Sequence, residues 1–192
     1  MSKKRSVRAC VAGLVFACAL VSASSMATQA DTVTTTIPVG NIPTDVAINP
    51  AGTFAYVANL SSGTVSKINL ATDTVTTISV GTTVYRVAIN PAGTFAYVAN
   101  YFGTVSKIDL ATDTVVATIT VGSSPGGVVI NPAGTFAYVT NGGSGTVSKI
   151  DMATDTVVAT ITVGSSAGGV VINPAGTFAY VTNVGSNTVS KI

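Results

Sequence analysis

The sequence has 192 residues, and its composition narrows the classes of function that it can support. Hydrophobic residues make up 47% of the chain, charged residues make up 8%, and histidine is absent. So apolar a chain is expected to fold, and without histidine it lacks the commonest general acid–base group and metal ligand. Beyond the basic N-terminal residues the sequence shows no basic patch, so we expect no nucleic-acid partner.

The first predicted element is a secretory signal peptide over residues 1–30. Four basic residues between positions 3 and 8 precede an apolar run at residues 9–21, which small residues follow. Because roughly 20 apolar residues are needed to cross a bilayer, this shorter run predicts a removable signal rather than a membrane anchor. Cleavage is expected after Ala30, with Ala27 as the alternative.

Removal of this segment would change the chemistry of the remaining chain. Cys10 and Cys18 both lie inside it, so residues 31–192 contain neither disulfides nor thiols. The remaining five basic and seven acidic residues give a formal charge of −2, and the abundance of Thr, Val and Ile favours strands. We expect a secreted or cell-surface protein without a membrane span, and the periplasm is a further possible location.

Residues 31–40, DTVTTTIPVG, form the next predicted element, an isolated strand. The motif NPAGTFAYV then begins at Asn49, Asn90, Asn131 and Asn173, at intervals of 41, 41 and 42 residues. A catalytic motif normally occurs once, whereas a motif repeated at a near-constant interval indicates a structural unit that stacks on copies of itself. We place the repeats at about 41–81, 82–122, 123–164 and 165–192.

Each repeat is predicted to contain short antiparallel strands joined by tight turns. In the third copy the strands are expected at residues 126–131, 136–141, 146–151 and 155–163, the first innermost and the last outermost. The Asn-Pro-Ala-Gly sequence is typical of the hairpin turn between the first two strands.

The charged side chains near the third strand of each repeat are expected to have structural rather than functional roles. Asp73, Asp113 and Asp155 are expected to bond backbone amides of the turn before the outer strand. Lys107 is predicted to be solvated or weakly paired with Asp109. Lys149 is likewise predicted to be solvated or weakly paired with Asp151.

A period near 42 residues with four antiparallel strands is the signature of a β-propeller blade. Residues 138–141 and 180–183 read Tyr-Val-Thr-Asn, and residues 56–59 and 97–100 carry Ala in place of Thr. In these letters the chain resembles the YVTN family of propeller repeats. The resemblance implies a secreted or cell-surface protein of bacteria or archaea, and it supplies no catalytic motif.

The predicted fold is therefore an all-β propeller of about four four-stranded blades over residues 31–192. The fourth copy shows only three strands, so residues 31–40 are expected to supply its fourth and to close the ring. This closure would cover a sheet edge that otherwise invites pairing with other chains. The alternative is a two-chain ring in which each copy lends this strand to the other.

The copies differ mainly in the loops at one end of the strands. There the second repeat carries Tyr85, Arg86, Tyr101 and Phe102, and Asp45 occupies in the first repeat the position of Arg86. Loops on a rigid scaffold commonly carry recognition, so these five residues are the candidate binding site. The alternative is drift in unconstrained loops, with Asp45 and Arg86 merely pairing.

Two classes of function remain open at this point. The favoured one is a non-enzymatic scaffold that binds an extracellular protein or glycan through the variable loops. The alternative is a propeller enzyme of the lactonase or quinoprotein type. Because the variable end offers no convergent acids, histidines or metal ligands apart from Asp45, we expect no catalytic residues, no metal and no cofactor.

Overall fold

The computed structural model describes residues 32–192, so the predicted signal peptide lies outside the described residues. The chain divides into two compact units, residues 1–36 and Ile37–Ile192, and all the described strands belong to the second unit. Residues 32–36 of the first unit form no helix or strand.

The second unit contains four antiparallel sheets, which we call blades 1 to 4. Blade 1 consists of β1 (Pro43–Ile48), β2 (Phe54–Asn59), β3 (Thr64–Asn69) and β4 (Val75–Ser79). Blade 2 consists of β5 (Val84–Ile89), β6 (Phe95–Asn100), β7 (Thr104–Asp109) and β8 (Thr114–Thr120). Blade 3 consists of β9 (Pro125–Ile130), β10 (Phe136–Asn141), β11 (Thr146–Asp151) and β12 (Thr156–Thr162). Blade 4 consists of β13 (Ala167–Ile172), β14 (Ala179–Asn183) and β15 (Thr188–Lys191), with the short 3-10 turn η1 (Val184–Ser186) before β15.

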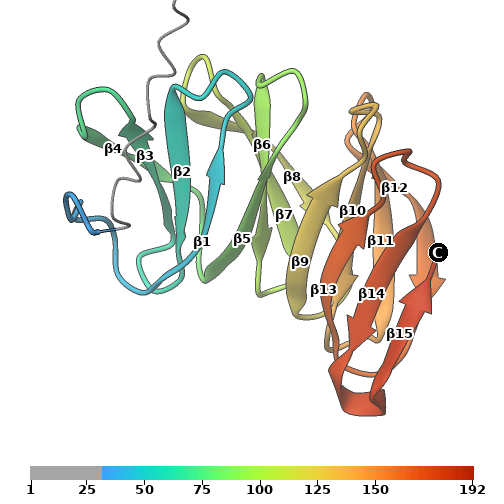
Figure 1. The fold of residues 1–192 in the computed structure, drawn as a ribbon. Coiled ribbons are helices and arrows are strands. Elements are labelled where there is room, and N and C mark those ends of the chain that lie inside the picture. Colours follow the sequence, from blue (N-terminus) through green and yellow to red (C-terminus); the bar gives the residue numbers. More distant parts are fainter. Residues whose placement is uncertain (1–31) are drawn as a thin grey trace, which may run out of the picture. The chain divides into compact units, whose positions relative to one another are not determined.

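The predicted all-β, propeller-like fold is confirmed. In each blade the strands follow one another in sheet order, and β10 and β11 coincide with the strands expected for the third copy. The first strands of successive blades lie next to each other, β1 beside β5, β5 beside β9 and β9 beside β13. Within the second unit the blades follow each other in a row along this inner line of strands (Figure 1).

Hydrophobic side chains fill the space between neighbouring blades and form what we call the joints. In the first joint, Tyr56 and Val65 of blade 1 pack in one cluster with Val87 and Val98 of blade 2. Equivalent clusters occupy the joints between blades 2 and 3 and between blades 3 and 4. A single blade could not bury both of its faces, so stacking is what creates the core.

The Asn-Pro-Ala-Gly turns have the predicted hairpin chemistry. Oδ1 of Asn49 accepts hydrogen bonds from the backbone N–H groups of Thr53 and Phe54, each at 2.9 Å. Gly52 adopts a φ of +66°, and its N–H donates to the Asn49 carbonyl at 2.8 Å. The same side-chain contacts recur in the other three copies. The repeated motif is thus explained by turn geometry and a buried strand.

The last asparagine of each second strand ties two strands together inside the blade. Nδ2 of Asn100 donates to Oγ1 of Thr104 at 3.1 Å and to Oγ of Ser106 at 2.8 Å. This side chain is buried, as are its three counterparts. These bonds satisfy the Nδ2 donors of the buried amides, while the Oδ1 atoms have no partner among residues 32–192.

The prediction for Asp73, Asp113 and Asp155 is wrong. The backbone amides of these turns instead donate to the side chain of the residue four positions before each of these aspartates. Before Asp113, for example, the Ala111 N–H donates to Oδ1 of Asp109 at 2.8 Å. The three aspartates themselves adopt left-handed φ angles of 56° to 58°. The residue at that earlier position is Asn69 in blade 1 and Asp109 or Asp151 in blades 2 and 3, and it lies only two residues from the amide that it binds.

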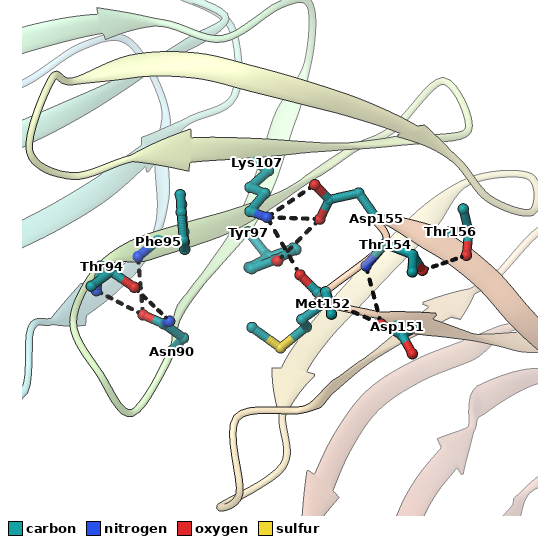
Figure 2. A network of polar contacts seen from close by, with 11 residues as sticks. Asn90, Thr94, Phe95, Tyr97, Lys107, Asp151, Met152, Thr154, Asp155 and Thr156 are labelled. Atoms are coloured by element: carbon teal, nitrogen blue, oxygen red, sulfur yellow. Dashed lines mark hydrogen bonds and ion pairs between the residues drawn. The ribbon is translucent and has the colours of Figure 1, made fainter.

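The prediction that Lys107 is solvated is also wrong. Its Nζ lies 2.9 Å from both carboxylate oxygens of Asp155 in the next blade and 4.3 Å from the centre of the Phe95 ring. Figure 2 shows this pair together with Tyr97, whose hydroxyl lies 3.4 Å from the same carboxylate. Lys67 pairs in the same way with Asp113 of blade 2, at 2.8 Å. Stacking of the blades brings the turn before the outer strand of blade 2, and that of blade 3, over the lysine of the preceding blade.

Closure of the ring by residues 31–40 is not confirmed. Among the described residues, 32–39 belong to no strand and blade 4 has three strands. Ile37 and Val39 instead pack against Ala55 and Val57 of blade 1. These apolar side chains therefore already have partners on the face of blade 1 that no other blade covers.

Candidate binding rim

The variable loops lie at one end of the strands, which we call the loop rim. It comprises the connection between the second and third strands of each blade and the connections that enter β1, β5, β9 and β13. The opposite end, formed by the Asn-Pro-Ala-Gly turns, is the turn face. The two ends are separate because antiparallel strands send alternate connections to opposite ends of a sheet.

Backbone hydrogen bonds fix the position of the rim loops. The carbonyl of Thr83, just before β5, accepts a hydrogen bond from the N–H of Tyr101 at 3.0 Å. Ser124 binds Gly142 in the same way in blade 3, at 2.9 Å. Both Thr83 and Ser124 adopt left-handed φ angles, of 59° and 52°. The rim side chains therefore stand on a backbone held at both ends.

The rim contains an open hollow of about 560 Å³ that extends over blades 2, 3 and 4. Its aromatic side is formed by Tyr85 and Tyr101 of blade 2, with Arg86 beside them. Blades 3 and 4 contribute small residues, which are Ser124, Pro125, Gly126, Gly142, Gly143, Ser166, Ala167, Gly168 and Gly169, together with Val184. Several backbone groups of this wall are already hydrogen-bonded, as the N–H of Gly142 is to the Ser124 carbonyl and the N–H of Gly143 is to the Ser123 carbonyl.

The charged part of the rim is the pair formed by Arg86 and Asp45. Nη1 of Arg86 lies 3.3 Å from Oδ1 of Asp45, and Oδ2 of Asp45 accepts a hydrogen bond from the backbone N–H of Val87 at 3.0 Å. The Arg86 side chain is 47% exposed and that of Asp45 is 22% exposed. Asp45 is therefore occupied in joining blades 1 and 2, while the guanidinium keeps donors that face the solvent.

The aromatic part of the rim is exposed to solvent. The rings of Tyr101 and Phe102 meet edge to face with their centres 5.7 Å apart, and Phe102 is 71% exposed. The guanidinium carbon of Arg86 lies 5.9 Å from the centre of the Tyr85 ring. Exposed aromatic rings beside an arginine are typical of residues that dominate binding energy at interfaces.

The structure thus brings three of the five candidate residues together around one hollow: Tyr85, Arg86 and Tyr101. Phe102 stands beside Tyr101 without lining this hollow, and Asp45 lines a second one of about 390 Å³, together with Arg86. The pairing of Asp45 with Arg86, which the drift interpretation expects, is present. The exposed rings of Tyr85, Tyr101 and Phe102, on which the binding interpretation depends, remain accessible to a partner.

Sequence reasoning missed the other wall of the hollow. Gly126, Gly142 and Gly168 come from loops that were noted as variable but carry no side chain to single out. Thr140 helps to position this wall, since its Oγ1 donates to the Gly168 carbonyl at 2.5 Å and accepts from the Gly127 N–H at 2.7 Å. The threonine of the Tyr-Val-Thr-Asn motif therefore joins blades 3 and 4, and that motif was the available signal.

Two tyrosines outside the rim have perturbed acidity. Burial, and then the negative charge of Asp113, raise the pKa of Tyr56 to about 12. Burial also raises the pKa of Tyr97, with further contributions from the charge of Asp155 and from the hydrogen bond to it. Both hydroxyls lie in joints between blades, which gives their shifts a structural explanation.

Residues 32–192 contain no group of three or more acidic, cysteine or histidine side chains placed to hold a metal ion. Within that range there is also no helix with the length and hydrophobicity needed to span a membrane.

No protein-family model matches the chain, and no curated protein matches it. Solved structures do match. Hydrazine synthase of Kuenenia stuttgartiensis is 28% identical with a TM-score of 0.75, over 85% of this chain and 48% of that one. A functionally unknown protein from Desulfotomaculum acetoxidans is 19% identical with a TM-score of 0.66, over 78% and 55% of the two chains. U3-55K is 11% identical with a TM-score of 0.67, over 81% and 53%.

These likenesses support the propeller-like architecture. The second and third have low identity and therefore bear on the fold alone. The chain spans about half the length of each of the three proteins that it matches.

Proposed function

We propose that this protein is a secreted or cell-surface propeller of the YVTN-repeat type that binds an extracellular protein or glycan through its loop rim. In this proposal the nearly identical blades are the scaffold, and the loops of blade 2 supply the recognition. The protein catalyses no reaction and needs no cofactor.

The observation that carries the proposal is the hollow beside Tyr85, Arg86 and Tyr101. Aromatic rings present a large flat surface and lose little conformational freedom when a partner covers them, and arginine adds directional hydrogen bonds. The small residues across the hollow leave room for such a ligand. Sugar rings and peptide segments both combine apolar surface with hydrogen-bonding groups, so they suit such a site.

The chemistry of the charged groups supports binding over catalysis. The acid among the candidate residues, Asp45, is engaged by Arg86 and by the Val87 N–H, so it is poorly placed to accept a proton from a substrate. The sequence contains neither histidine nor glutamate that could take this role. The signal-like residues 1–30 support the proposed export.

The test is recovery of a partner on the purified protein, by pull-down from the native environment and by a glycan array. The double change Arg86→Ala and Tyr101→Ala should weaken the recovered interaction by about 2 kcal/mol or more, while the melting temperature stays nearly unchanged. Ala51→Ser and Ala133→Ser, on the turn face, are the matched controls and should leave binding intact.

Two results would overturn the proposal. In the first, the partner responds to the turn-face controls and ignores the changes at the rim. In the second, the purified protein turns over a lactone or transfers electrons when loaded with a metal or quinone cofactor. The second result would establish the enzymatic alternative.

A further inference from the structure

The two ends of the row of blades expose hydrophobic side chains that are buried at every internal joint. On blade 1 we define the head face as Val46, Ile48, Ala55 and Val57. Val46 is 60% exposed, whereas its counterparts in blades 2, 3 and 4 are buried against the preceding blade. Ile37 and Val39 cover Ala55 and Val57 but leave Val46 and Ile48 exposed.

Blade 4 presents the opposite half of the same arrangement. We define its tail face as Val171, Tyr180 and Val189, all on one side of the sheet. Tyr180 is 40% exposed, while Tyr97 at the same position of blade 2 is fully buried by blade 3. Val171 and Val189 are 63% and 61% exposed.

The head and tail faces are complementary because each internal joint is made from one face of each kind. Tyr56 and Val65 of blade 1, which are tail-type residues, meet Val87 and Val98 of blade 2, which are head-type residues. We propose that the tail face of one chain binds the head face of a second copy and that two copies form one ring. The contact joins two different surfaces, so its geometry can close a ring.

Charge supports the same pairing. At two of the three internal joints, Lys67 pairs with Asp113 and Lys107 pairs with Asp155 of the following blade. Lys191 stands at the lysine position of blade 4, and Asp73 stands at the aspartate position of blade 1 with nearly the same left-handed φ of 58°. Among residues 32–192 neither forms a salt bridge. Lys191 of one copy would meet Asp73 of the other.

Residues 37–42 already follow the path of a strand that arrives from a preceding blade. A Cβ atom added to Gly40 would lie 2.7 Å from the side chain of Asn59, and one added to Gly122, at the end of blade 2, would lie 2.6 Å from Asn141 of blade 3. Ile42 has the same left-handed φ as Ser124, which precedes blade 3. The strand-like sequence before Ile37 is therefore suited to the free edge of β15 in the second copy.

Two copies fit this scheme better than one chain closing on itself. Blades 1 and 4 lie at the two ends of the row within the second unit (Figure 1).

The test measures the mass of the full secreted chain in solution by light scattering and sedimentation equilibrium. We expect twice the mass of the monomer. Val189→Lys should raise the dissociation constant at least tenfold, because it places a charge in the tail face. Val158→Lys is the matched control, since Val158 is also exposed but lies on the outer strand β12, and it should leave the dimer intact. Circular dichroism of each variant verifies the fold.

Charge reversal gives a second test that does not depend on hydrophobic packing. Lys191→Asp or Asp73→Lys alone should weaken the dimer at least tenfold, and the two changes together should restore most of the affinity. A chain that stays monomeric up to its solubility limit would overturn the proposal. So would growth into open filaments, or a double variant that associates no better than the single ones.

Discussion

Blades 2 and 4 share most of their sequence, yet the same letters have different surroundings in the two blades. Tyr97 of blade 2 is buried between blades, whereas Tyr180 of blade 4 is 40% exposed. Lys107 forms a buried ion pair with the following blade, and Lys191 instead lies over the Phe178 ring, 3.6 Å from its centre. Burial in this molecule is therefore set by the neighbouring blade and not by the residues of the blade itself.

The largest expected difference between the two blades concerns their tyrosines. Tyr97→Ala should lower the free energy of unfolding by about 3–5 kcal/mol, because it leaves a cavity in the joint between blades 2 and 3. Tyr180→Ala in a dilute sample should lower it by less than about 1 kcal/mol, since little packing is lost at an exposed site. Denaturant unfolding measures both, and equal losses would contradict the role assigned to the following blade.

A smaller difference is expected for the aspartates that face these joints. Asp155→Asn should lower the free energy of unfolding by about 2 kcal/mol, because the nearly buried Lys107 loses a charged partner. Asp73→Asn is the matched control, as Asp73 forms no salt bridge among residues 32–192, and it should have almost no effect in dilute solution. Denaturant curves at low and high salt measure these effects. A similar loss in both variants would mean that the aspartates act through their turns.

The effect expected to be smallest at neutral pH is a loss of stability that occurs only in alkali. The pKa of Tyr56 is raised from 10.0 to about 12, so its neutral form is favoured in the folded protein. Its contribution to stability is complete below pH 10 and is lost as the pH rises from 10 towards 12. Tyr56→Phe should therefore flatten the fall in stability over this window, while Tyr101→Phe at the rim should not. Melting temperatures measured across the window would show it, and parallel curves would refute it.

Much of the fold could be predicted because it depends on contacts that are short in sequence. The hairpin turns require Asn49, Pro50 and Gly52 at fixed spacing, and the strands between them have a clear pattern. The Lys107–Asp155 pair could not be predicted in this way, because its members are 48 positions apart and meet only when blades stack. The pairing of Asp113 with Lys67 was missed for the same reason.

The candidate site was predictable only in part. Tyr101 and Arg86 stand out because the other copies carry different residues at their positions. The glycine wall opposite them carries no chemical signal in the sequence, and its position depends on how Thr140 ties β9 to β13. The loops identify which residues vary, but the shape of the hollow arises from the stacking of three blades.

Two strands inside different blades have identical sequences, and this affects how the chain reaches its native state. Strands β7 and β11 have the same sequence and pair with β6 and β10 in the same register. During refolding, β7 could pair with β10 at little cost, and the resulting trapped species would have to open before the native pairs form. Few features distinguish the correct partner, among them the different lengths of the loops that lead into β7 and β11. Synthesis from the N-terminus, which presents the strands one after another, would reduce this kinetic trapping.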